Sequence, residues 1–371
     1  MTLTDQQGGA LKAVAAWLKD RHRKQVFRVF GYAGTGKTTL ARQIAEESGG
    51  RVLFAAFTGK AAKVLRARGA SNARTIHSLI YRPRGEEIEE ETGTVSPTFS
   101  INRTSPVSEA ALVIIDECSM VDEELGRDLL SFGTPVLVLG DPGQLPPVSG
   151  GGFFTEAQPD VMLTEIHRQA RDNPIVELAR KVREGEPLDY GTYGESMVVR
   201  RNEIPEGRVP EADQVLVGTN RTRHRFNRRL REIAGFDDPL PCAGDRLVCL
   251  RNDPKKGLLN GSLWQVTSAP RSTKPSLTMI VQSDDDGLER NMAKIRVLKQ
   301  AFLEPDADIP WALQRRHDAF DYGYALTVHK AQGSQWNDVV VFDESYAFKD
   351  HRERWLYTAI TRAAERVTVV R

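Results

Sequence analysis

Short apolar runs alternate with stretches of helical periodicity through the first part of the chain. The runs are rich in β-branched and aromatic residues, as buried strands are, and occupy 26–30, 52–57, 112–115 and 135–139. After the first run, apolar residues recur at helical spacing at Leu40, Ala41, Ile44 and Ala45. This alternation predicts an open α/β sheet, in which ligand-binding residues follow the carboxyl ends of the strands.

Two segments depart from this pattern. Beyond residue 163 a second α/β unit begins, with strand-like runs at 197–199, 215–217, 339–342 and 367–370. Within it, residues 244–318 hold short β-prone pieces separated by turns, and this change of pattern predicts a small inserted barrel. Residues 82–105 carry an acidic run and then β-prone residues, which predicts a hairpin turning near Gly93, with a solvated loop as the alternative. The predicted division is a first core at 1–165 containing the 82–105 insertion, a second core at 166–243 and 319–371, and the barrel at 244–318.

Composition adds little to this division. The chain has 371 residues and a net charge of +1, so overall charge neither indicates nor excludes a nucleic-acid partner. No apolar run approaches the ~18 residues of a membrane span, and the first residues lack a signal peptide's order, so we expect a cytoplasmic protein with no membrane partner. Cys118, Cys242 and Cys249 lack metal-ligand spacing, which argues against a cysteine metal site.

A glycine-rich turn joins the run at 26–30 to the first internal helix. Gly31, Gly36, Lys37 and Thr38 fit the pattern Gly-x-x-x-x-Gly-Lys-Ser/Thr, whose backbone N–H groups surround phosphates at a helix N-terminus. We expect Lys37 to neutralise the β- and γ-phosphates of ATP and the Thr38 hydroxyl to bind Mg²⁺. The remaining predicted nucleotide contacts in this loop are Gly34, Thr35 and Thr39.

Two carboxylates follow the run at 112–115. In P-loop NTPases the first acidic residue at this position holds Mg²⁺ and the second orients the attacking water, so Asp116 and Glu117 are predicted in these roles.

Near the N-terminus, Thr4 and Gln7 fit a helix capping box. A glutamine beside the phosphate loop is also suited to read an adenine edge, and the two roles of Gln7 are compatible.

Polar residues follow other strands. Thr58 and Lys60 come directly after the strand-like run 52–57, and Thr75 and His77 have a similar strand-end context, so we expect these side chains to meet a ligand. For His77, local capping or packing is the alternative.

Residues 219–231 contain six arginines and no acidic residue. One helical face there carries Arg221, Arg225 and Arg228, which indicates a phosphate-binding surface, with a solvated helix as the alternative.

The segment 140–148 reads Gly-Asp-x-x-Gln-Leu-Pro-Pro-Val. It resembles the third motif of superfamily 1 helicases, in the branch that contains RecD and Dda. The other motifs of that family match in order at 31–39, 57–60, 75–77, 116–117, 165–169, 325–333 and 357–363, and Gln7 resembles its adenine-reading Q motif. The resemblance implies two RecA-like parallel-sheet P-loop cores, with a hairpin inserted in the first and an SH3-like barrel in the second.

The resemblance also implies a motor that hydrolyses ATP with Mg²⁺ at the seam of the cores. The implied catalytic residues are Lys37, Asp116, Glu117, Gln144 and the arginine fingers Arg168 and Arg362, with Gln332 and Gly333 beside the γ-phosphate. The implied contacts to single-stranded DNA are Thr58, Lys60, Thr75, His77, Thr327 and His329, while Phe99 would stack at a duplex junction. We expect a monomer moving 5′ to 3′ that can join a replication or recombination complex; the alternatives are an ATPase switch subunit or an RNA-directed helicase.

Overall fold

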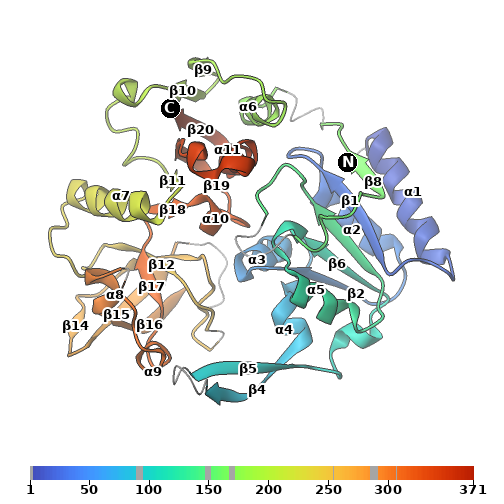
Figure 1. Cartoon of the computed structure of the whole chain (residues 1–371), viewed down its shortest axis with the longest axis horizontal. Coiled ribbons are helices and arrows are strands. Elements are labelled where there is room, and N and C mark those ends of the chain that lie inside the picture. The colour runs from blue at the N-terminus through green and yellow to red at the C-terminus, as the bar shows by residue number, and fades with distance from the viewer. Residues whose placement is uncertain are drawn as a thin grey trace.

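The computed structural model describes residues 3–88, 95–146, 152–166, 172–253, 255–284, 291–305 and 307–371. Within these ranges the chain forms two parallel-sheet cores that lie side by side, a third sheet next to the second core, and a hairpin that projects from the first (Figure 1). In the same ranges, no helix is both long and apolar enough to cross a lipid bilayer.

The first core is built on a six-stranded sheet of order β3-β2-β6-β7-β1-β8, in which every pair is parallel. Its strands are β1 (Val26–Gly31), β2 (Val52–Ala56), β3 (Arg74–Thr75), β6 (Leu112–Asp116), β7 (Val136–Gly140) and β8 (Val161–Leu163). Helices α1 (Asp5–Lys19), α2 (Lys37–Glu47) and α3 (Gly59–Ala67) cover one face, and α4 (Ile76–Ile80) and α5 (Glu123–Leu130) cover the other. Because both faces are buried, the strands are apolar without alternation.

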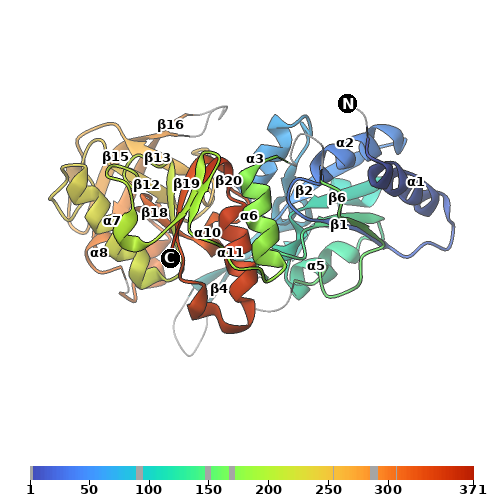
Figure 2. The same cartoon turned by 90° about the horizontal axis from the view of Figure 1, so that it is seen from above.

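The second core has the sheet order β18-β11-β19-β20-β10-β9, parallel except for the β9–β10 pair. Its strands are β9 (Gly191–Tyr193), β10 (Ser196–Val199), β11 (Gln214–Val217), β18 (Ala325–Thr327), β19 (Trp336–Phe342) and β20 (Ala363–Val370). Helices α6 (Pro174–Arg183), α10 (Val328–Ala331) and α11 (Arg352–Ile360) pack on one face, and α7 (Asn220–Ile233) packs on the other. Seen from above, α6 and α11 lie between the two sheets (Figure 2).

The third sheet is antiparallel and lies between α7 and β18 in sequence. Its strands are β12 (Arg246–Cys249), β13 (Leu263–Val266), β14 (Arg271–Ser272), β15 (Ser276–Ser283), β16 (Met292–Leu298) and β17 (Phe320–Tyr322), accompanied by the short helices α8 (Gln300–Leu303) and α9 (Trp311–Gln314). Its apolar side chains form a core of their own around Trp264. Since β17 pairs with β12, the inserted unit extends past the predicted boundary at residue 318.

The insertion in the first core is a β-hairpin, as predicted. Strand β4 (Tyr81–Ile88) pairs antiparallel with β5 (Val95–Ile101), and the predicted turn at Gly93 lies outside the described residues. Strand β5 of the hairpin contacts helix α9 of the inserted unit (Figure 1). The hairpin therefore bridges the first core and the third sheet.

Candidate active site and nucleic-acid groove

The phosphate loop runs from the end of β1 to the start of α2. Gly36 caps α2 with φ 74°, a left-handed conformation that glycine adopts without cost, and a side chain at Gly31 would place its Cβ 2.6 Å from Thr35 Oγ1. Lys37 Nζ donates to the carbonyl oxygens of Gly31 at 2.6 Å and Tyr32 at 3.0 Å. The loop is thus compact, and the open N-terminus of α2 presents N–H groups that suit an anion.

The two predicted carboxylates lie beside this loop. Thr38 Oγ1 donates to Asp116 Oδ2 at 3.0 Å, and burial, reinforced by the neighbouring Glu117, raises the pKa of Asp116 while Lys37 opposes the shift. Glu117 has φ 54° and ψ 48°, a left-handed backbone that is uncommon for a residue with a side chain and clusters at functional sites. A hydroxyl and a buried carboxylate side by side are oxygen ligands that suit Mg²⁺.

A cleft of about 460 Å³ lies between the two cores at this loop. The first core contributes the loop, the two carboxylates and Gln144, and the second core contributes a smaller set of residues. The predicted residues that line the cleft are Gly34, Gly36, Lys37, Thr38, Thr39, Asp116, Glu117, Gln144, Gly333 and Arg362. Folding therefore brings together residues from distant motifs, such as Lys37 and Arg362, which lie 325 positions apart in the chain.

The structure describes only one of the two predicted arginine fingers. Arg362 is 5% exposed, and its guanidinium donates to the carbonyl oxygens of Thr358 and Ser334, both at 3.2 Å. These bonds hold the side chain at the second core's side of the cleft. Arg168 lies outside the described residues, so its role stays a prediction.

Three predicted nucleotide contacts do not line the cleft, and one of them, Gln332, lines the second groove described below. Gln7 forms the predicted capping box with Thr4, and its Nε2 donates to the carbonyl oxygen of Thr35 at 2.9 Å, so this buried glutamine supports the phosphate loop from below. Thr35 Oγ1 donates to the carbonyl oxygen of Tyr32. Gln332 Nε2 donates to the carbonyl oxygen of Leu145 at 2.9 Å and thereby joins the second core to the segment after Asp141.

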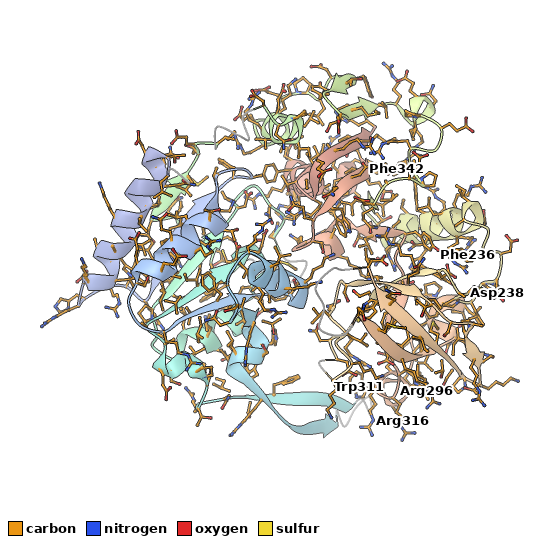
Figure 3. The ribbon with its side chains drawn as sticks, turned by 180° about the vertical axis from the view of Figure 1, so that it is seen from behind. Phe236, Asp238, Arg296, Trp311, Arg316 and Phe342 are labelled. Carbon is orange, nitrogen blue, oxygen red and sulfur yellow. The ribbon has the colours of Figure 1, made fainter. Side chains whose placement is uncertain are left out.

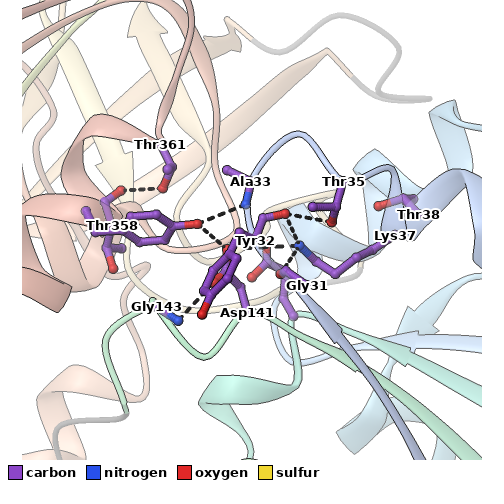
Figure 4. A network of polar contacts seen from close by, with 12 residues as sticks. Gly31, Tyr32, Ala33, Thr35, Lys37, Thr38, Asp141, Gly143, Thr358 and Thr361 are labelled. Atoms are coloured by element: carbon purple, nitrogen blue, oxygen red, sulfur yellow. Dashed lines mark hydrogen bonds and ion pairs between the residues drawn. The ribbon is translucent and has the colours of Figure 1, made fainter. Parts of the chain in front are cut away.

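A tyrosine that the sequence did not single out joins the cores most directly. The Tyr357 hydroxyl of α11 donates to Asp141 Oδ2 at 2.7 Å, and the hydroxyl oxygen accepts the Ala33 N–H of the phosphate loop at 2.9 Å. Figure 4 labels Ala33 and Asp141 in this network. Lys37 Nζ lies 4.0 Å from Asp141 Oδ2. Burial raises the pKa of Tyr357 well above its usual value, with the Asp141 charge adding to the shift, so the hydroxyl keeps its proton.

A second unpredicted contact lies close by. The Arg183 guanidinium of α6 stacks on the Tyr32 ring of the phosphate loop, 3.7 Å from its centroid. Asn173 and Arg68 also line the cleft. The Arg183–Tyr32 contact carried no local sequence signal, since it is set by the packing of one core on the other.

A separate groove of about 320 Å³ lies between the cores and the third sheet. Its lining includes the predicted Thr58, Lys60 and His329, together with Phe57, Lys330 and residues of β12. Lys60 is only 7% exposed and its Nζ lies over the Trp336 ring, 4.7 Å from the centroid. The Thr58 and Thr327 hydroxyls each accept a backbone N–H at the start of a helix, α3 and α10.

From this groove a row of four rings leads to the hairpin. Phe57 meets His77 at 6.4 Å between centroids, His77 meets Tyr81 at 5.4 Å, and Tyr81 meets Phe99 at 6.3 Å. Burial lowers the pKa of His77, against the raising effect of Asp122 and Glu124, which favours a neutral ring. Thr75 caps α4 next to this row, and Phe99 is 56% exposed.

The arginines of α7 divide between two surroundings. Arg223 and Arg231 are buried and paired with Asp321 and Asp245. The predicted Arg221 and Arg225 are exposed, and neither lines the cleft or the groove. Their predicted role as DNA contacts therefore stays a prediction, at a place apart from the cleft and the groove.

The fold and the cleft define a P-loop protein with two RecA-like cores. Residues 2–203 match a family described as an AAA domain, and residues 322–370 match a UvrD-like helicase C-terminal domain. The first match covers more than half of the chain, and the motif order places the chain within one branch. The chain belongs to the superfamily 1 helicases, in the branch that contains RecD and Dda.

Named relatives agree with this placement. The ATP-dependent RecD2 DNA helicase of Deinococcus radiodurans is 29% identical over 394 residues, which cover 98% of this chain and 48% of the relative. The ATP-dependent DNA helicase dda of Enterobacteria phage T4 is 32% identical over 198 residues, which cover 49% of this chain and 43% of the relative. The chain thus spans about half the length of these curated relatives.

Solved structures share the fold. Bacteroides Pif1 bound to ssDNA superposes with a TM-score of 0.59 at 20% identity, covering 99% of this chain and 92% of that chain. Pif1 from Candida albicans superposes with a TM-score of 0.54 at 19% identity, covering 100% and 95%. At such identities the likeness supports the two-core architecture alone.

Proposed function

We propose that the protein is an ATP-dependent DNA helicase that moves along single-stranded DNA and separates duplexes, in the 5′-to-3′ direction of its branch. One observation carries the proposal: a single cleft holds the phosphate loop and both carboxylates of the first core together with Arg362 of the second. A site divided between two cores links nucleotide chemistry to their relative movement.

Six residues of the cleft have a chemical task in this proposal. Lys37 and the α2 N-terminus bind the phosphates of ATP, Glu117 orients the attacking water, and Arg362 with Gln144 stabilises charge at the γ-phosphate. Thr38 and Asp116 would hold Mg²⁺, whose charge offsets that of the phosphates. Arg362 would leave its carbonyl partners to reach the phosphate, so closure of the cores is part of the step.

The DNA path is proposed along the second groove. Thr58, Lys60 and His329 would contact phosphates there, aided by Thr327, and the strand would continue past Thr75 and His77. The row of rings from Phe57 to Phe99 supports this course, because bases stack on aromatic faces without sequence preference. At its end, the exposed Phe99 on the hairpin would act as a wedge at the duplex junction.

The test is strand displacement with the purified chain on duplexes that carry a single-stranded tail of either polarity. We expect ATP-dependent displacement on the 5′-tailed duplex, none on the 3′-tailed duplex, and none with Lys37→Ala. Failure to displace either substrate despite DNA-stimulated hydrolysis would indicate an ATPase switch subunit instead. Stronger stimulation by RNA than by DNA strands of the same sequence would indicate an RNA-directed enzyme.

A further inference from the structure

A hollow of about 510 Å³ lies on the second core, away from the cleft and the groove. The half-buried Phe226 of α7 forms its floor, backed by Phe342 of β19, which is 4% exposed and whose ring centroid lies 4.4 Å away. Its rim carries Arg201, Arg225, Arg228 and Arg229, with Glu232 as the single acidic residue. Figure 3 labels Phe342 on this side of the molecule, beside α7 and remote from the first core.

The position of the hollow separates it from the proposed motor machinery. Phe226 and Phe342 belong to the apolar cluster on the α7 face of the second sheet, whereas α6 and α11, which border the nucleotide cleft, pack on the opposite face. No residue of the hollow lines the cleft or the groove. A ligand in this hollow would therefore occupy neither of the proposed ATP and DNA sites.

The charge of the rim is not balanced within the described part of the chain. Arg229 pairs with Glu232 at 3.0 Å, but the side chains of Arg201, Arg225 and Arg228 form no ion pair or hydrogen bond with the described residues. By contrast, the inward-facing Arg223 and Arg231 of the same helix each have a buried aspartate. Guanidinium groups that are free and exposed around an apolar floor favour a ligand that brings both carboxylates and an apolar side chain.

We propose that this hollow is a docking site for an acidic peptide segment of a partner protein, with one aromatic side chain seated on the half-buried Phe226, whose ring packs on Phe342. Flanking carboxylates of the segment pair with Arg225 and Arg228. The aromatic anchor gains burial and ring contacts on the floor, and the charges fix the register of the peptide. A nucleic-acid strand would bring phosphates and stacking bases, but the hollow lies on the α7 face of the second sheet, away from the groove proposed for DNA, and this position favours the peptide.

A neighbouring hollow extends the path available to such a segment. It has a volume of about 520 Å³, shares Arg201 with the first hollow, and is lined by Tyr190, Tyr346 and Arg352. Tyr190 is 48% exposed and Tyr346 is 67% exposed, which is high for aromatic side chains. A peptide that crosses Arg201 would cover both hollows.

Fluorescence anisotropy with defined probes tests the proposal. The first probe is an end-labelled peptide of aspartate and serine residues with one central phenylalanine; the second replaces that phenylalanine by serine. The intact chain should bind the phenylalanine peptide roughly tenfold or more tightly than the serine peptide. The double variant Arg225→Glu, Arg228→Glu should lose roughly tenfold or more of the affinity for the first probe, through two lost charge-assisted contacts.

Arg221→Glu is the matched control, because Arg221 is exposed on the same helix but lies outside the hollow. This variant should change the peptide affinity less than about twofold, because salt screens the interaction between exposed charges that are not in contact. Unaltered thermal unfolding of the double variant excludes misfolding. Equal binding of the two peptides, or full binding by the double variant, overturns the proposal. The proposal is also overturned if a single-stranded oligonucleotide displaces the peptide and binds the double variant more weakly than the intact chain. The surface would then be a DNA-binding site.

Discussion

Replacing Tyr357 by phenylalanine removes one oxygen atom that joins three segments of the cleft. The hydroxyl donates to Asp141, a carboxylate only 3% exposed, and accepts the Ala33 N–H of the phosphate loop. The ring itself stays, so packing in the second core is preserved. The substitution therefore isolates the polar contacts of this hydroxyl, while the Leu145 N–H of the first core still donates to Thr358 Oγ1 of α11 at 2.9 Å.

The expected cost follows from these two bonds. A hydrogen bond to a charged group contributes ~1.5–3 kcal/mol and a neutral one about 1 kcal/mol, of which water recovers a part when the hydroxyl is gone. A net loss of about 2 kcal/mol changes the equilibrium between joined and separated cores by ~30-fold. The phosphate loop is where this change becomes observable, because the Ala33 amide loses its acceptor.

Hydrogen exchange measured by mass spectrometry on peptides spanning residues 31–37 is the assay. In Tyr357→Phe we expect the Ala33 amide to exchange about tenfold to thirtyfold faster, in proportion to the lost free energy. Tyr81→Phe is the matched control, because Tyr81 also donates to a carboxylate, Asp128 at 2.6 Å, but within the first core. Unchanged exchange across 31–37 in Tyr357→Phe would refute the bridging role of the hydroxyl.

Four further substitutions test the proposed site. Lys37→Ala should weaken binding of a fluorescent nucleotide and abolish turnover; retained affinity would contradict its phosphate role. Glu117→Gln should spare nucleotide affinity but abolish hydrolysis, and normal turnover would remove Glu117 from catalysis. Arg362→Ala should keep nucleotide affinity and lower the rate by roughly 10³-fold or more, whereas weaker binding at an intact maximal rate would reassign it. Phe99→Ala should slow duplex unwinding but keep DNA-stimulated hydrolysis, since a lost base stack costs ~1–3 kcal/mol; unwinding at the original rate would exclude the wedge.

The sequence by itself determined the features whose causes are local. The glycine spacing and the lysine of the phosphate loop act within a few residues, and the run at 112–115 delivers Asp116 and Glu117 directly, so these were identifiable before any packing was known. Each apolar run that we interpreted as a strand is a strand in the structure, because strands buried on both faces leave a continuous apolar signal. The order of motifs then gave the branch of helicases.

Only the tertiary structure decided which distant groups meet. Tyr357, Arg183 and Gln332 acquire their partners in or near the phosphate loop and motif III because the second core packs against the first. The arginines of α7 show the same limit: the sequence presents six similar cations, and packing against Asp321 and Asp245 neutralises two of them. Helical periodicity places a side chain on a face, but the neighbouring sheet determines whether that face is buried and which charge opposes it.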